Sequence, residues 1–306
     1  MATNTTKQSK NVVKIIGTLV ENSLKQNSYK NAEQVDTEYI SGTLIIRVNQ
    51  QISGKNEISD IPVSVWVSKY KKDGVTINPA YESMAKAMNT YTSLTVSQNE
   101  STATKVIITS GNVTENIYSI DGVNVYCSPR IQTNFISSIT NPESFAPEAT
   151  FITDIVVGNI EDEVNPSDNV PTGRLKVKGM ICRYNGTMDT VDYIVENTNA
   201  INFIRSYWNI GDTVQIGGKI RYSVKTEQIE VSTRFGDPIV KSKTTNCREF
   251  VITADSSDSL TEEQKYSKEE IETGLAKRAE LIEAAKNKSK KTVSTASVAK
   301  ANPYGF

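Results

Sequence analysis

Apolar and polar residues alternate along several segments of the chain between residues 12 and 253. In one of them, Ile61, Val63, Val65 and Val67 occupy every second position. A period of two places alternate side chains on opposite faces of a strand, so this spacing predicts a half-buried β-strand. The same reasoning predicts ten strands in all, at residues 12–20, 38–48, 61–70, 105–118, 123–139, 151–160, 174–184, 190–196, 211–225 and 249–253.

Two short segments have helical spacing instead. Between residues 78 and 92, Tyr81, Met84 and Met88 recur three or four positions apart. Residues 199–208 repeat this spacing and end on Trp208. Residues that share one stripe of a short helix usually pack into the core, and we expect this of Tyr81 and Tyr91 in the first segment and of Trp208 in the second. Tyr193 shares a strand face with Val191 and Val195 and is also expected in the core.

The order of these elements is three strands, a helix and two strands, and it occurs twice. This is the element order of the OB-fold, a small five-stranded barrel. Gly179 and the Gly217–Gly218 pair fall inside predicted strands, where glycines allow the bulges that a small barrel needs. The predicted fold is mostly β, with two tandem OB-like five-stranded barrels, each with a short helix, followed by a C-terminal helix and a disordered tail. Other small barrels and sandwiches can share this pattern.

A local repeat supports duplication of one module. The segment Ser41–Ile46 (SGTLII) matches Thr172–Val177 (TGRLKV) at the same place in the two series. The first module, residues 11–140, is longer because it has additional polar stretches at 49–60 and 71–78, which we interpret as loops. The second module is expected at residues 149–254.

The composition changes in residues 255–306. Thr261–Gln264 is a capping-box pattern that predicts the start of a charged helix, which extends to about Lys288. The apolar stripe of this helix is thin, so the helix needs a partner or is marginal. Residues 289–301 are rich in Lys, Ser, Thr and Ala and are expected to be disordered. The chain then ends in an apolar tip that contains Pro303, Tyr304 and Phe306.

The composition argues against most catalytic chemistry. The chain has no histidine, which removes the usual general base and the commonest metal ligand. Cys127, Cys182 and Cys247 are far apart, and no glycine-rich phosphate loop occurs. We therefore predict a non-enzymatic protein without a metal or another cofactor. Chemistry that uses carboxylates alone is the remaining enzymatic alternative.

No apolar run is long enough to cross a bilayer and no signal peptide is recognised, so a cytoplasmic location is expected.

The formal net charge is −1, so a nucleic-acid site would have to be a local patch. The second module contains a candidate, because alternation places five cations on the outward faces of two predicted strands. These cations are Arg174, Lys176, Lys178, Lys219 and Arg221. The alternative is that they are ordinary surface charges on strands.

The first module contains a second candidate. Trp66 and Tyr70 lie out of phase with the valines of their strand and are followed by lysines. An exposed aromatic ring can stack on a base while neighbouring cations hold phosphates. The neighbouring candidates are Lys69, Lys71, Lys72, Arg47 and Arg130. The alternative is that Trp66 packs beneath a loop or against the other module.

Tandem barrels, a linker and a terminal aromatic residue resemble single-stranded DNA-binding proteins of the OB-fold kind, particularly those of bacteriophages. The resemblance implies a body that binds single-stranded DNA in replication or recombination, located in the host cytoplasm. It also implies a tail that recruits replication or recombination proteins. The residues before Pro303 are basic or neutral, whereas the bacterial pattern is acidic, so phage proteins are the expected partners of this tail.

A structural virion or assembly protein is the alternative function. Strands rich in Thr, Ser and Asn and a net charge near zero fit a protein that uses β-barrels for protein contacts. The sequence also leaves open whether the nucleic acid is DNA or RNA.

Overall fold

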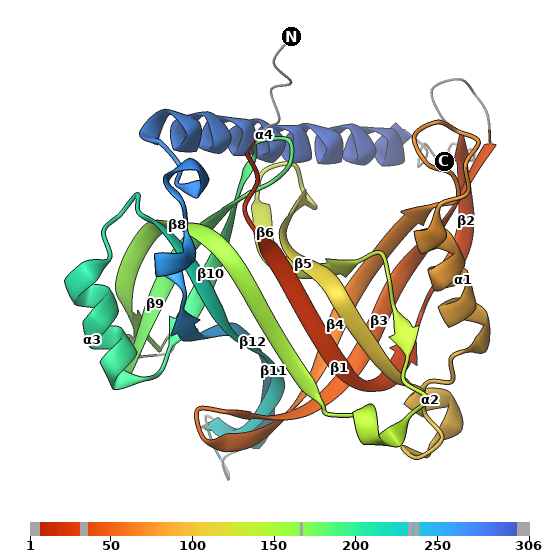
Figure 1. Cartoon of the computed structure of the whole chain (residues 1–306), viewed down its shortest axis with the longest axis horizontal. Helices are drawn as coiled ribbons and strands as arrows, with labels where there is room; N and C mark the ends of the chain where they lie inside the picture. Colours follow the sequence, from red (N-terminus) through yellow and green to blue (C-terminus); the bar gives the residue numbers. More distant parts are fainter. Residues whose placement is uncertain (1–6, 31–35, 166–167, 232–234, 236–238, 299–306) are drawn as a thin grey trace.

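A computed structural model describes residues 7–30, 36–165, 168–231, 235 and 239–298 (Figure 1). The first barrel closes through β1, β3, β4, β6 and β5 in that order, and β5 pairs back to β1. Only the β4–β6 pair of this barrel is parallel. Its strands and helix are β1 (Asn11–Asn22), β3 (Asp36–Ile52), β4 (Lys55–Ser68), α1 (Pro79–Thr90), β5 (Lys105–Ser119) and β6 (Val125–Thr133).

The second barrel repeats this topology. It closes through β8, β9, β10, β12 and β11, and β10–β12 is its parallel pair. Its elements are β8 (Glu148–Val164), β9 (Pro171–Cys182), β10 (Met188–Val195), α3 (Thr198–Tyr207), β11 (Thr213–Val231) and β12 (Ile239–Asp255). The strand pairing of both barrels is that of the OB-fold, and the predicted fold class is confirmed.

Several short elements complete the described chain. They are β2 (Lys25–Lys30), which pairs with β3, α2 (Leu94–Ser97), β7 (Ser137–Ser138), three 3₁₀ turns and the long helix α4 (Lys268–Val298). The 3₁₀ turns cover Pro142–Ser144, Ser257–Ser259 and Glu262–Gln264. Helix α4 continues beyond the predicted end near Lys288 as far as Val298, through part of the segment that was expected to be disordered.

The core follows the alternation in the sequence. Leu44 and Ile46 of β3 and Ile61 and Val63 of β4 are completely buried, and the residues that alternate with them are half-buried on the outer face. Tyr81, Tyr193 and Trp208 are buried as predicted, and Tyr91 packs half-buried against the same core.

The repeat in the sequence corresponds to a repeat in the structure. Gly42 in β3 and Gly173 in β9 both have a positive φ, of 152° and 79°. A Cβ on Gly42 would lie 2.5 Å from the carbonyl oxygen of Ser23, so no other residue fits at that point. The Gly217–Gly218 pair forms the predicted bulge in β11, where a Cβ on Gly218 would meet the carbonyl oxygen of Val251.

Residues 49–60 form a hairpin arm and not the predicted loop. Ser53 and Gly54 make its tight turn with φ values of 49° and 80°, and β3 and β4 remain paired up to this turn. The arm reaches the second barrel, where the Gln50 amide donates to the Ile220 carbonyl at 2.9 Å and accepts from the Ala149 N–H at 2.9 Å. β1 also pairs directly with β8, so a continuous sheet joins the barrels.

Helix α4 packs against the body of the protein, which is the partner that its thin apolar stripe requires. It lies along one side of the molecule, over both barrels (Figure 1). Before it, Tyr266 is buried among Val156, Met180 and Met188, and Gly274 allows the helix to approach Met188 closely. Arg278 then makes two hydrogen bonds of 2.6 Å to the Glu115 carboxylate of β5.

Candidate nucleic-acid interface

A groove of about 540 Å³ lies on the outer face of the first barrel. The central strands of this face are β3, β4 and β6, and the pairings Thr43–Ser64 and Ser64–Gln132 align their outward side chains across the sheet. The groove is lined by Gly42, Thr43, Ser64, Val65, Trp66, Arg130, Gln132 and Asn134. Hydroxyl, amide and guanidinium groups therefore lie beside one large aromatic ring.

Three aromatic rings gather at one end of this groove. The Trp66 side chain is 55% exposed, which confirms that it lies out of phase with the buried valines of β4. Its ring centroid lies 5.7 Å from that of Tyr39 and 6.5 Å from that of Tyr29. The pairing of β2 with β3 brings Tyr29 to this cluster. The cluster leaves much of Trp66 open to a planar ligand, which is what stacking on a base requires.

Arg130 is the cation that lines the groove itself. Among the described residues, no carboxylate forms an ion pair with Arg130. Its polar neighbour in the groove is the Gln132 amide, whose oxygen lies 3.1 Å from the Arg130 Nε in the orientation that allows a hydrogen bond. Burial lowers the pKa of the Arg130 guanidinium and the nearby Arg183 lowers it further, while the charge of Asp189 raises it in part. An arginine remains protonated under these conditions, so Arg130 offers a positive charge to an anion in the groove.

The other cations of the first module differ in their surroundings. Lys69 pairs with Glu38 at 2.7 Å and lies over the half-buried Tyr70 ring, and Arg47 forms a two-pronged pair with Asp60. Lys71 and Lys72 are exposed in the turn after β4, and the ion pairs found in the described part of the chain include neither. The two paired cations are already neutralised, whereas the two exposed ones remain available to a phosphate backbone.

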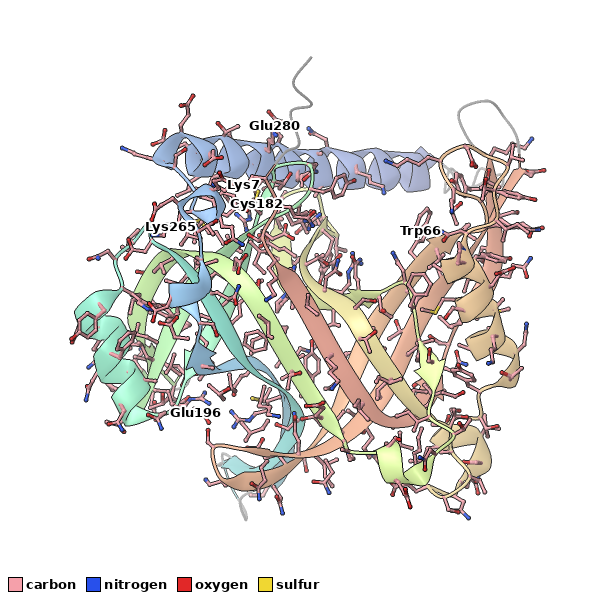
Figure 2. All side chains as sticks on the ribbon, in the orientation of Figure 1. Lys7, Trp66, Cys182, Glu196, Lys265 and Glu280 are labelled. Atoms are coloured by element: carbon pink, nitrogen blue, oxygen red, sulfur yellow. The ribbon has the colours of Figure 1, made fainter. Side chains whose placement is uncertain are left out.

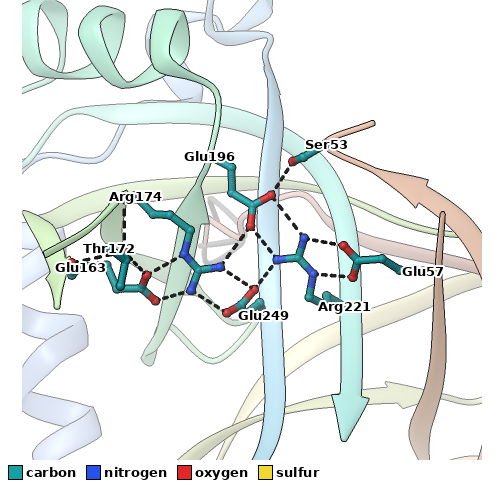
Figure 3. Close-up of polar contacts among 8 residues, drawn as sticks. All are labelled: Ser53, Glu57, Glu163, Thr172, Arg174, Glu196, Arg221 and Glu249. Carbon is teal, nitrogen blue, oxygen red and sulfur yellow. Dashed lines mark hydrogen bonds and ion pairs between the residues drawn. The ribbon is translucent and has the colours of Figure 1, made fainter. Parts of the chain in front are cut away.

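Arg174 and Arg221 of the second module belong to an inter-barrel ion cluster (Figure 3). Arg221 is 8% exposed, and its guanidinium binds the carboxylate of Glu57, which the hairpin arm of the first barrel supplies, at 2.7 and 2.9 Å. Both arginines share the carboxylates of Glu196 and Glu249, and Arg174 also binds Glu163. Two guanidinium groups thus meet four carboxylates, and the cluster has a net negative charge that would repel phosphates.

The protonation of this cluster follows from its contacts. Burial by itself would raise the pKa of Glu196, but hydrogen bonds from Arg221, Ser53 and Arg174 lower it to about 2. Burial likewise opposes the charge of both arginines, and the glutamates around them raise the pKa of each guanidinium. Hydrogen bonds from the arginines also lower the pKa of Glu249, so both arginines and the two glutamates that they share are charged near neutral pH.

The three predicted lysines of the second module are less constrained. Lys176 pairs with Glu161 at 2.5 Å, whereas Lys178 is exposed opposite Asp192 of β10. Lys219 is half-buried on β11. The structure therefore does not bring the five predicted cations together as a free basic face, and their role in binding DNA stays a prediction.

The remaining functional expectations fall partly outside the described residues. Pro303, Tyr304 and Phe306 of the predicted recruiting tip lie beyond residue 298, where the description ends. Within the described ranges, no group of three or more metal-ligating side chains could hold a metal ion. No described helix combines the length and the apolar character that crossing a membrane demands.

The predicted site did not include Gln132, which lines the groove, or Tyr39 and Tyr29, whose rings lie next to Trp66. Tyr39 alternates with Ser41 and Thr43 on the polar face of a predicted strand, so its place beside Trp66 could have been found from the register of the two strands. Gln132 could have been found in the same way, since it alternates with Arg130. Tyr29 had no such signal, because every residue of β2 is exposed and the segment shows no apolar alternation.

Comparison with known proteins gives a family and a distant structural likeness. The YorF family model matches residues 10–288, so the chain belongs to the YorF family. No curated protein matches the chain significantly. Among solved structures, the chain is similar to a deletion mutant of the single-stranded DNA binding protein from Thermus aquaticus, with a TM-score of 0.46 and 10% identity, over 86% of this chain and 98% of that chain.

Proposed function

We propose that this member of the YorF family is a non-enzymatic protein that binds single-stranded DNA along the groove of its first barrel. The observation that carries the proposal is the side-by-side arrangement of an exposed Trp66 and of Arg130, which forms no ion pair with a described carboxylate, in one groove. OB-folds bind oligonucleotides on the face of their second and third strands, which are β3 and β4 here. The groove occupies this face.

The groove offers each part of a nucleotide a suitable contact. A base can stack on the open face of Trp66, and the guanidinium of Arg130 can hold a phosphate. Hydroxyl and amide groups of Thr43, Ser64 and Gln132 can bond to sugar or phosphate oxygens. Stacking and charge accept any base, so we expect a weak sequence preference and a strong dependence on salt.

Lys71 and Lys72 extend the positive potential beyond the end of β4. They stand in a turn, where long side chains can follow a mobile phosphate backbone. The second barrel supports this site mechanically, because its outward arginines are held in the ion cluster with the hairpin arm. The biological role that we propose is DNA replication or recombination in the cytoplasm, with protein partners bound by the tip of the chain.

Titration of the purified protein with fluorescent oligothymidine at two salt concentrations tests this function. Binding that weakens steeply with salt is expected, with a slope of log affinity against log salt of roughly −0.7 per neutralised phosphate. An oligouridine arm determines whether RNA is bound equally well. Absence of binding to oligothymidine at low salt refutes the proposal.

A further inference from the structure

The β5–β6 hairpin carries an exposed aromatic pair that lies outside the groove. Tyr118 of β5 and Tyr126 of β6 stand directly opposite each other in the ladder. Their rings are stacked, with centroids 5.4 Å apart and planes 25° apart, and their side chains are 41% and 47% exposed. Ile120 and Val123 at the turn of the hairpin are even more exposed. Such an exposed apolar end is unusual for a surface that contacts water alone.

The two tyrosines lie on the same face of the hairpin as the groove arginine. Residues opposite each other in an antiparallel ladder share a face, and so do alternate residues of one strand. The ladder has no register shift, so the pairs Tyr118–Tyr126, Asn116–Ser128 and Thr114–Arg130 follow one another along one face. A continuous path therefore leads from the tyrosines past polar side chains to Arg130, and from there to Trp66.

The opposite face of the hairpin is fixed by two other parts of the molecule. Glu115 is almost fully buried there and accepts two hydrogen bonds from Arg278 of α4. Its carboxylate also accepts from the Thr190 hydroxyl of the second barrel at 2.9 Å. Arg183 of the same barrel donates to the Glu115 carbonyl at 2.9 Å. Because one face is held in this way, the tyrosine pair projects from a rigid support.

We propose that Tyr118 and Tyr126 form a second base-stacking subsite for the same DNA strand that occupies the groove. This inference rests on the proposed function. The polar residues between the tyrosines and Arg130 suit a sugar-phosphate backbone better than an apolar protein partner. Tyr126 and Gln132 are six positions apart on β6, which corresponds to ~20 Å of strand.

This distance makes the subsite dependent on the length of the DNA. A strand with stacked spacing of ~3.4 Å needs about six nucleotides to cover ~20 Å beyond the groove. An oligothymidine of about 5 nucleotides can fill the groove alone, whereas one of about 20 exceeds the usual site of a single OB-fold. The two lengths therefore separate the groove from the second subsite.

The test measures the affinity of both oligothymidines for the full chain with Tyr118 and Tyr126 replaced together by alanine. We expect the affinity for the long oligonucleotide to fall roughly fivefold to a hundredfold, and the affinity for the short one to be unchanged. Replacing both by phenylalanine keeps the rings and should restore long-oligonucleotide binding. Tyr184→Ala is the matched control, because Tyr184 is 72% exposed on the second barrel.

The outcomes distinguish this inference from the proposed function. If the double alanine variant binds the long oligonucleotide as tightly as the unaltered protein, while Trp66→Ala weakens binding, the subsite is refuted and the groove stands. If the double variant loses affinity for both lengths equally, the tyrosines support the groove structurally and the subsite is again refuted. If the unaltered protein binds neither length, both proposals fall.

Discussion

Replacing each of the two tryptophans by alanine separates binding from folding. Trp66 is 55% exposed on the groove, whereas Trp208 is 8% exposed and its indole N–H donates to Asp255 at 3.3 Å. Loss of a stacked base costs on the order of 1–3 kcal/mol, so Trp66→Ala should weaken oligothymidine binding roughly fivefold to a hundredfold. Truncation of a buried tryptophan costs roughly 3–5 kcal/mol of folding free energy, and Trp208→Ala should lose this amount.

The stability of the Trp66 variant can be bounded from its contacts. Trp66 touches Tyr39 and Tyr29 but has more than half of its surface in water, so its truncation should cost at most about half of the buried value, ~2 kcal/mol. Trp66→Phe keeps a stacking ring and should retain most of the affinity. This variant therefore separates the loss of stacking from a general disturbance of the aromatic cluster.

The assays are fluorescence anisotropy with oligothymidine and denaturant unfolding of each variant. The expected pattern is weak binding with near-normal stability for Trp66→Ala, and lowered stability for Trp208→Ala. If Trp66→Ala binds normally, or if Trp208→Ala is as stable as the unaltered chain, the assignment of the two rings is wrong.

Three further predictions follow from the charges and the C-terminal segment. Arg130→Gln should make the slope of log affinity against log salt shallower by roughly 0.7, whereas Arg47→Gln, whose partner is Asp60, should leave this slope unchanged in the same titrations. Because the folded-state pKa of Glu196 is lowered to about 2, its stabilising contribution is complete above pH ~4.5 and is lost as the pH falls toward 2. On acidification, the free energy of unfolding of Glu196→Gln should therefore fall by up to ~3 kcal/mol less than that of the surface control Glu161→Gln. Equal acid unfolding curves for the two variants would contradict the role of the ion cluster. Deletion of residues 302–306 should leave DNA affinity unchanged but remove a partner protein from a pull-down. If the terminal lysines hold DNA, deletion from Asn287 onward should lower both the DNA affinity and its salt slope. Parallel DNA titrations of the two truncated proteins distinguish a recruiting tail from one that binds DNA.

The barrel strands were predictable because core burial imposes a period of two. The valines of β4 alternate strictly, and this spacing also placed Trp66 on the outside correctly. The strand β2 could not be predicted in this way, because all of its residues are exposed and its conformation comes from pairing with β3. The arm at residues 49–60 was missed for a related reason, since its polar residues face the second barrel and not a core.

Only one property of the candidate site was predictable from the sequence, namely the face of its own strand on which each side chain lies. Alternation shows that Arg174 and Arg221 point outward, but it does not show what covers an outward face. Glu57, which binds Arg221, is 164 positions away in the sequence. Arg130 and Trp66 were both singled out from the sequence, but their meeting in one groove depends on the parallel pairing of β4 with β6, which a pattern of residues does not encode.

The equivalent outer faces of the two barrels have different surroundings. Both present charged residues on the second strand of the barrel, β3 in one case and β9 in the other. In the second barrel the arm of the first covers Arg221, and the additional glutamates give the cluster more negative than positive charge. In the first barrel no comparable arm lines the described groove, and the ion pairs of the described residues do not include Arg130. A buried ion cluster is often no more stabilising than apolar packing of the same volume, but the loss of one of its partners is strongly destabilising. The second barrel therefore serves to hold the arm and the β5–β6 hairpin in place, and DNA binding should concentrate on the first barrel.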